Sequence, residues 1–139
     1  MHLMANHFTI IIPSYNNEKW AKRCLGSALR QDYDNYDVVY INDCSTDDTA
    51  KVVQQIIEEV ETKAEVRVVN NQTNRKALYN LWHQISTAKD GTIIVTLDGD
   101  DWFPNDQILN ILNQTYLMED IWITAGSYID NAAGMISSP

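Results

Sequence analysis

The sequence predicts an α/β domain: a mostly parallel sheet flanked by helices, forming a single open αβα sandwich. Strand-like and helix-like patterns alternate along the chain, and the connections between them are short. This order is typical of parallel sheets, because each parallel strand needs a crossover segment to return the chain. The 139 residues suit one domain, which can bury about 70% of the surface exposed by its unfolded chain.

The first strand is expected at residues 8–12, a β-branched run typical of a strand buried on both faces, and it should end at Pro13. A helix should follow over 18–30, with Asn16 or Asn17 as its N-cap. Its buried stripe is expected to consist of Trp20, Cys24, Leu25, Ala28 and Leu29.

Residues 37–42 repeat the strand pattern. The next helix should begin near Asp47, after a cap from Ser45 or Thr46, because acidic residues in a first turn suit the positive end of the helix dipole. Its buried face is expected to consist of Val52, Val53, Ile56, Ile57 and Val60.

The remaining elements continue the alternation. Strands are expected at 66–69 and 92–97, with a helix over 76–86 between them. A last helix fits 106–117, and 121–124 has the pattern of a fifth strand. The helix over 76–86 carries four apolar residues at helical spacing: Leu78, Leu81, Trp82 and Ile85.

Composition excludes several classes of protein. The net charge of −9, with no run of basic residues, disfavours nonspecific nucleic-acid binding. No apolar run could span a bilayer and no signal peptide is evident, so we expect a cytoplasmic protein in which Cys24 and Cys44 are free thiols. Neither a dinucleotide-binding glycine motif nor a P-loop is present.

The residues that follow the predicted strands are polar. In an open parallel sheet the ligand crevice lies beyond the carboxyl ends of the strands, so these residues are the candidates for a site. They occupy positions 13–16, 42–45, 70–75 and 98–101.

Three carboxylates gather in the last of these segments. If the strand stays extended, Asp98 and Asp100 project to the same side, and Gly99 allows a close approach between them. Carboxylate oxygens there could hold Mg²⁺ or Mn²⁺, completed by water and by phosphates of a ligand. The alternative is that Asp100 or Asp101 serves as a turn or cap residue. Because a buried strand leads into the cluster, we favour the metal site.

Three further residues each allow two interpretations. Asp43 could accept a hydrogen bond from a base, such as the imide N–H of uracil, or it could cap the following turn. Tyr15 could stack on a base or pack against a neighbouring helix. Arg75 could bind phosphate or a pyrimidine carbonyl, or it could be a solvated arginine at a helix end.

Taken together, these motifs resemble the family 2 glycosyltransferases of the GT-A fold. The resemblance rests on PSYN (13–16), INDCSTDDT (41–49), the stretch 70–91 and LDGDDWF (97–103), in that order and spacing. It covers the chain from Phe8 to about Thr124. Four linked motifs make it more specific than the D-x-D motif alone.

The resemblance implies a nucleotide-sugar donor, most often a UDP-sugar, held with Mn²⁺ or Mg²⁺ at the D-x-D motif. By position, Pro13 and Tyr15 would border the nucleoside, Asp43 would bind the base and Arg75 would position the nucleotide. Among the acidic residues, Asp98 and Asp100 would serve the ribose and the metal, with Asp100 the direct metal ligand.

Two departures from the family pattern matter. Asn42 stands where the family usually has aspartate, and Cys44 where it usually has glycine. The acceptor-binding half and the catalytic base of the family lie downstream of the matching region. We therefore expect residues 1–139 to form one donor-binding domain truncated before that half, with an unknown acceptor and no catalytic base assigned.

Two other functions remain open at this stage. The chain could be a non-catalytic nucleotide or nucleotide-sugar binding module, which keeps the donor site but performs no transfer. It could also be a metal-dependent phosphoryl-transfer enzyme with a flavodoxin-like sheet. That second alternative leaves residues 13–16 and Arg75 unexplained.

Overall fold

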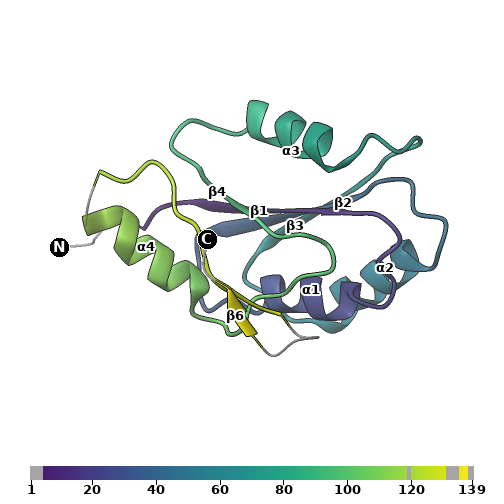
Figure 1. Ribbon diagram of the computed structural model, residues 1–139, viewed down its shortest axis with the longest axis horizontal. Coiled ribbons are helices and arrows are strands. Elements are labelled where there is room, and N and C mark those ends of the chain that lie inside the picture. Colours follow the sequence, from purple (N-terminus) through teal and green to yellow (C-terminus); the bar gives the residue numbers. More distant parts are fainter. Residues whose placement is uncertain (1–4, 119, 131–134, 138–139) are drawn as a thin grey trace.

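The computed structural model describes residues 5–118, 120–130 and 135–137, and it contains the predicted parallel sheet (Figure 1). Four strands pair in the order β3-β2-β1-β4, and all three pairings are parallel. A separate antiparallel ribbon pairs β5 with β6. The strands are β1 (Phe8–Ser14), β2 (Tyr36–Asn42), β3 (Glu65–Asn70), β4 (Ile93–Thr96), β5 (Tyr128–Asp130) and β6 (Met135–Ser137).

Helices cover both faces of the sheet, as the sequence predicts. Figure 1 shows α1, α2 and α4 on one side of it and α3 on the other. Their bounds are α1 (Ala21–Leu29), α2 (Thr49–Glu59), α3 (Ala77–Ser86) and α4 (Ile108–Met118). Within the part of the chain that is described, no helix has the length and apolar character needed to cross a bilayer.

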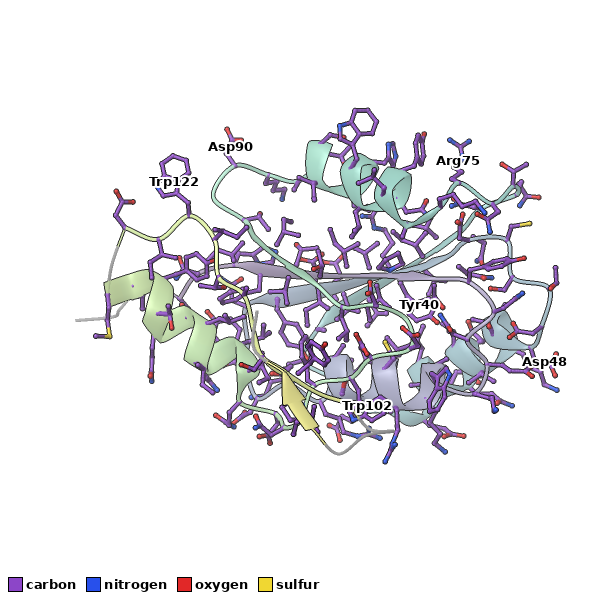
Figure 2. The ribbon with its side chains drawn as sticks, in the orientation of Figure 1. Tyr40, Asp48, Arg75, Asp90, Trp102 and Trp122 are labelled. Carbon is purple, nitrogen blue, oxygen red and sulfur yellow. The ribbon has the colours of Figure 1, made fainter. Side chains whose placement is uncertain are left out.

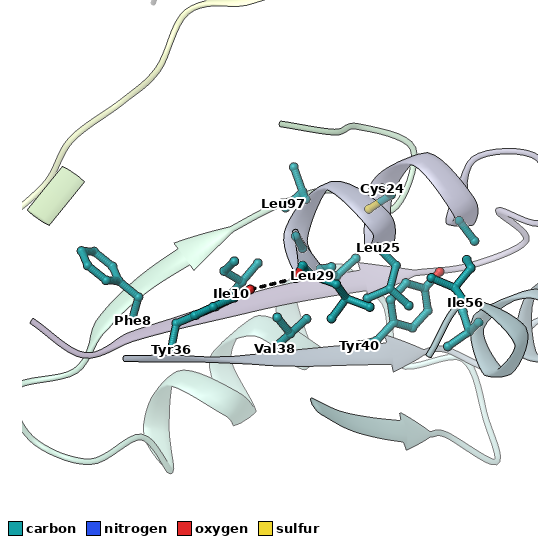
Figure 3. Close-up of a cluster of buried hydrophobic side chains, with 14 of the residues drawn as sticks. Phe8, Ile10, Cys24, Leu25, Leu29, Tyr36, Val38, Tyr40, Ile56 and Leu97 are labelled. Atoms are coloured by element: carbon teal, nitrogen blue, oxygen red, sulfur yellow. Dashed lines mark hydrogen bonds between the residues drawn. The ribbon is translucent and has the colours of Figure 1, made fainter. Parts of the chain in front are cut away.

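The main core lies between the sheet and the helices α1 and α2 (Figure 3). Both central strands are buried almost throughout, which explains their continuous apolar runs. Of the stripe predicted for α1, all but Trp20 are buried. Within this core, the Tyr36 hydroxyl of β2 donates a 3.0 Å hydrogen bond to the Leu29 carbonyl at the end of α1. A smaller cluster on the other face contains Ile11, Val39 and Ile41.

Strand β1 does not end at Pro13, as the sequence predicts, but continues to Ser14. Proline costs a central strand one ladder hydrogen bond when its nitrogen faces a paired neighbour. The backbone N–H and C=O groups of Ile11 face β4, since the Ile11 carbonyl accepts the Leu97 N–H at 3.1 Å. The backbone nitrogen of Pro13, two residues later, faces the same side. Because β4 has already ended there, the missing N–H of Pro13 removes no bond.

The predicted fifth strand at 121–124 is wrong. These residues form no strand, and Trp122 and Ile123 are exposed. The next strand begins only at Tyr128 and pairs with β6 rather than with the main sheet.

The apolar residues of α3 do not form a buried stripe. The buried residues of α3 are the polar Asn80 and Gln84. Only Leu81 contacts the smaller cluster on this face of the sheet. The other apolar residues at helical spacing, Leu78, Trp82 and Ile85, are exposed.

The N-cap residues Trp20 of α1 and Asp48 of α2 make no side-chain cap hydrogen bond, although Asp47 Oδ1 accepts the Thr49 N–H at the start of α2 at 3.0 Å. The residues predicted for that role were Asn16 or Asn17 for α1 and Ser45 or Thr46 for α2. The loop after β1 and the loop after β2 instead form hydrogen bonds with each other, ahead of the two helices. Asn16 Oδ1 accepts the Thr46 N–H at 2.8 Å, and Glu18 Oε2 accepts the Asp48 N–H at 2.9 Å. In return, Asp47 Oδ2 accepts the Glu18 N–H at 3.2 Å.

Candidate functional site

The polar segments that follow the strands meet at one rim of the sheet. Ser14, Asn42 and Asn70, the last residues of β1, β2 and β3, lie in register with one another. Strand β4 is shorter and ends at Thr96, opposite Ile11. The acidic segment therefore begins below the rim and lies beside the end of β1.

The acidic segment folds as a turn rather than as an extended strand. The Asp101 N–H donates to the Asp98 carbonyl at 2.9 Å, which closes the turn, so the expected alternation of Asp98 and Asp100 along a strand is wrong. All three carboxylates are exposed. Partial desolvation of its carboxyl group raises the pKa of Asp101, and the charges of Asp100 and Asp98 raise it further. The turn is thus a concentrated source of negative charge.

No group of three or more histidine, cysteine or acidic side chains converges as a ready-made metal site within the described ranges. A cation at this rim would therefore be held by one or two carboxylates of the turn, with its other ligands from water or a bound anion. Mg²⁺ commonly binds in this way, through few carboxylates and the phosphates of a substrate.

Gly99 places the turn directly against the end of β1. A Cβ atom at this position would lie 2.8 Å from the Cβ of Ser14 and 2.5 Å from the Asn17 amide nitrogen. Ser14 is itself fixed, because its hydroxyl accepts hydrogen bonds from Asn17 Nδ2 at 3.0 Å and from the Tyr40 hydroxyl at 2.7 Å. Sequence analysis anticipated a close approach at Gly99 but missed Ser14 and Asn17 as the groups that approach it.

Replacing Gly99 with alanine is expected to shift the acidic turn away from β1. The added methyl group overlaps Ser14 and Asn17, and such overpacking costs about 1–3 kcal/mol. Chemical denaturation of the variant should report this loss of unfolding free energy. Gly126→Ala is the matched control, because a Cβ there meets no atom within 4 Å. Equal stability of the two variants would contradict the packing at Gly99.

Two further contacts tie the turn to α1. The Cys24 thiol donates to the Asp98 carbonyl at 3.4 Å, and burial, followed by the nearby carboxylates, raises the pKa of Cys24. Cys24 therefore stays a neutral thiol, and it is free, as predicted. Trp102 stacks with Trp20 at a ring-centroid distance of 6.3 Å, and the Arg23 guanidinium lies 4.5 Å above the Trp102 ring.

Asp43 is 3% exposed and joins the end of β2 to the segment before α3. Its Oδ1 accepts the Asn71 amide at 2.8 Å and the Arg75 N–H at 2.9 Å, while its Oδ2 accepts the Lys76 N–H at 2.8 Å. Burial acts to raise the pKa of Asp43, but these hydrogen bonds outweigh it and the pKa lies below its ordinary value. About one of the four acceptor positions of the carboxylate remains free.

The other three predicted residues differ in how much surface they offer. Tyr15 is exposed at the rim. Arg75 is also exposed, but its guanidinium lies 4.9 Å above the Tyr79 ring, and its Nη1 donates to the Tyr79 hydroxyl at 2.6 Å. Four of its five N–H donors remain for a ligand. Pro13 is buried within β1, so its side chain offers little surface.

Backbone strain collects at the same rim. Among the described residues, three that are not glycine have positive φ: Asn16 (54°), Cys44 (63°) and Lys76 (71°). They lie in the segments after β1, β2 and β3, respectively. Such conformations persist only where the surroundings enforce them, and they cluster at functional sites. Glycine suits the position of Cys44 because it adopts a positive φ without steric cost.

Comparison with known proteins finds a matching family and similar proteins. The family described as Glycosyl transferase family 2 matches residues 9–125. The chain is 29% identical over 103 residues to the poly(ribitol-phosphate) beta-N-acetylglucosaminyltransferase TarS of Staphylococcus aureus, covering 73% of this chain and 17% of TarS.

Two solved structures share the fold. The S. aureus TarS 1–349 structure in complex with UDP matches with a TM-score of 0.64 and 28% identity, over 76% of this chain and 30% of that one. The Pyrobaculum calidifontis mannosyltransferase PcManGT, in complex with GDP-Man and Mn²⁺, matches with a TM-score of 0.69 and 25% identity, over 84% and 33%. The chain thus spans a third or less of the length of these proteins.

Proposed function

Because the chain belongs to glycosyl transferase family 2, we propose that it forms the donor-binding part of a glycosyltransferase, which binds a UDP-sugar together with a divalent metal ion. The observation that carries this proposal is the convergence of the segments after all four parallel strands at one rim, where an acidic turn is packed against β1. The similarity to a TarS structure that contains UDP supports uracil as the base.

Asp98 and Asp100 would bind the metal, with Asp100 as the direct ligand and Asp98 also reaching the ribose. Their exposed carboxylate oxygens are the hard ligands that Mn²⁺ and Mg²⁺ accept, and the charge of Asp101 adds to the negative potential there. When bound, the metal would neutralise charge that develops on the diphosphate as the bond to the sugar breaks. The similarity to PcManGT, whose structure contains Mn²⁺, supports this role.

The nucleoside would lie between the segments that follow β1, β2 and β3. The exposed ring of Tyr15 can stack on the base, next to Pro13. Asp43 can accept the imide N–H with its remaining acceptor position, because three backbone and amide donors already hold the carboxylate in place. Arg75 can turn its free N–H donors toward the diphosphate.

Transfer also requires an acceptor hydroxyl and a base to remove its proton. No described residue is assigned as that base, and the acceptor, whether glycan, protein or lipid, is left open. The donor site can be tested without either, since sugar transfer to water consumes a UDP-sugar slowly.

A thermal-shift panel of nucleotides and nucleotide sugars, each with and without Mn²⁺, tests the proposal. A specific ligand raises the unfolding midpoint by mass action. We expect the largest shift with UDP or a UDP-sugar in the presence of Mn²⁺. No shift with any of them would refute the donor site. Measured release of UDP from a UDP-sugar would then separate an enzyme from a non-catalytic binding module, which binds without turnover.

Replacing Tyr15 with alanine is expected to weaken UDP binding by about 1–3 kcal/mol, as for other bases stacked on aromatic side chains. Calorimetric titration with UDP and Mn²⁺ measures the change, and Tyr15→Phe should restore it because the ring alone provides the stacking. If Tyr15→Ala binds UDP as tightly as the wild type, Tyr15 does not contact the base.

A further inference from the structure

Helix α3 turns an apolar surface away from the sheet. Its side chains project outward along the top of Figure 2. We call this surface the α3 outer face; it consists of Leu78, Tyr79, Trp82 and Ile85, which are 80%, 39%, 61% and 48% exposed. A contiguous set of large apolar side chains on one helix face marks a surface that binds a partner or a membrane.

Hydrogen bonds on the opposite side of α3 fix this orientation. Asn80 Oδ1 accepts the Asn71 amide at 2.9 Å, and Gln84 Oε1 accepts the Arg67 guanidinium at 2.7 Å. Both amides are buried against the sheet. Rotating α3 to bury its apolar residues would break these bonds and expose the amides, so the outer face is a stable feature of the fold.

Residues 66–89, which contain α3, are basic although the chain as a whole is acidic, and the acidic Glu65 and Asp90 lie directly before and after them. Residues 66–89 contain four of the ten Lys and Arg residues and none of the nineteen Asp and Glu residues. Three of these basic residues, Arg75, Lys76 and Lys89, are exposed at the two ends of α3. The helix itself carries no acidic residue. An apolar face flanked by positive charge therefore stands on a strongly acidic protein.

The aromatic residues of this face form a connected group. The ring centroid of Tyr79 lies 6.2 Å from that of Trp82 and 6.1 Å from that of His83. The Arg75 guanidinium lies 4.9 Å from the centroid of the Tyr79 ring. Tyrosine and tryptophan have an apolar body with a polar tip, which suits the boundary between lipid and water.

We propose that the α3 outer face docks on an anionic membrane surface. An interfacial helix lies in the membrane plane, with aromatic and aliphatic side chains in the lipid boundary and Lys and Arg beside anionic headgroups. Helix α3 provides the aromatic and aliphatic side chains over its ten residues, and the basic residues lie just beyond its ends, with Arg75 and Lys76 before it and Lys89 after it. The docking would hold the sheet rim beside the membrane, because Arg75 and Lys76 belong to both surfaces. This inference goes beyond the proposed function and does not depend on donor binding.

A second copy of the chain fits the face less well. A specific protein interface uses roughly 20–30 residues on each side, whereas the outer face offers four large apolar side chains on one short helix. Pairing two α3 helices would also bring like charges from Arg75, Lys76 and Lys89 together.

Co-sedimentation with lipid vesicles tests the proposal. We expect the wild-type protein to bind vesicles of phosphatidylcholine and phosphatidylglycerol in equal parts, and to bind pure phosphatidylcholine at least about fivefold more weakly, since each basic residue near an anionic surface contributes about that factor. The double variant Leu78→Ser/Ile85→Ser should lose about tenfold or more in binding. The matched control on α4 is Ile111→Ser/Met118→Ser, whose side chains are 55% and 81% exposed, and it should bind as the wild type does.

Three results would overturn the proposal. The wild type could fail to bind anionic vesicles, or the α3 double variant could bind them as tightly as the α4 control. The wild type could also be a dimer in sedimentation velocity that becomes monomeric only in the α3 variant, which would assign the face to a second copy. Circular dichroism of each variant shows whether the fold is retained, and Lys89→Gln, which leaves the apolar face intact, tests the charge contribution separately.

Discussion

Replacing Asp100 with asparagine is expected to weaken manganese-dependent UDP binding by at least about 100-fold. Loss of a residue that only orients a metal ligand already costs about 10–100-fold in affinity, so loss of a direct ligand should cost more. Asparagine keeps the size of the side chain but removes the negative charge that the cation requires. Calorimetric titration with UDP, with and without Mn²⁺, measures the effect.

The control for this variant is Asp90→Asn. Asp90 is an exposed carboxylate that precedes β4, at the end of the strand opposite the acidic turn (Figure 2). It changes the net charge equally, so it should leave UDP binding unchanged. If Asp100→Asn retained the manganese-dependent affinity of the wild type, Asp100 would not belong to the metal site.

Replacing Asp43 with asparagine is expected to lower the free energy of unfolding by about 3 kcal/mol or more. The carboxylate accepts three hydrogen bonds while almost fully buried, and an amide in its place would turn an N–H₂ group toward N–H donors. Hydrogen bonds to a charged group contribute about 1.5–3 kcal/mol each, and buried donors left without a partner add to the loss. Urea denaturation at neutral pH measures the difference.

The same residue gives a pH dependence with a defined sign. The pKa of Asp43 is lower in the folded protein than its ordinary value of 3.8. Its stabilising effect is therefore complete above that value and is lost as the pH falls through the lower, folded-state pKa. The stability difference between wild type and Asp43→Asn should shrink below pH 3.8. Asp48→Asn, at an exposed carboxylate in the next segment, should show neither effect. A difference that stayed constant in acid would exclude a charged Asp43.

The sequence predicted the sheet and most of the helices because their patterns are long and strongly periodic. The runs at 8–12, 37–42 and 66–69 lie within β1, β2 and β3, and the alternation with helices required parallel pairing. It also predicted that polar residues would gather at one rim, since parallel strands all end on the same side. Family membership followed from four short motifs that keep their order and spacing along the chain.

The details of the site were not accessible in the same way. Local capping rules consider a helix and its own flanking residues, whereas Asn16 bonds Thr46 in a different loop. A single residue determines the distance between the acidic turn and β1, but that residue, Gly99, meets Ser14 from more than eighty positions away in the chain. The sequence also treated the acidic segment as extended, because nothing in it shows that β4 stops at Thr96.

Sequence alone determined the α/β class, the order of the elements and the residue types present at the rim, because these depend on periodicity and on the ends of parallel strands. Tertiary structure decided which groups meet there and which way α3 faces. An apolar stripe indicates that a helix has two different sides, but the hydrogen bonds that Asn80 and Gln84 accept from residues of other segments selected the side that points inward. Contacts between distant segments carry that information, and no local pattern contains it.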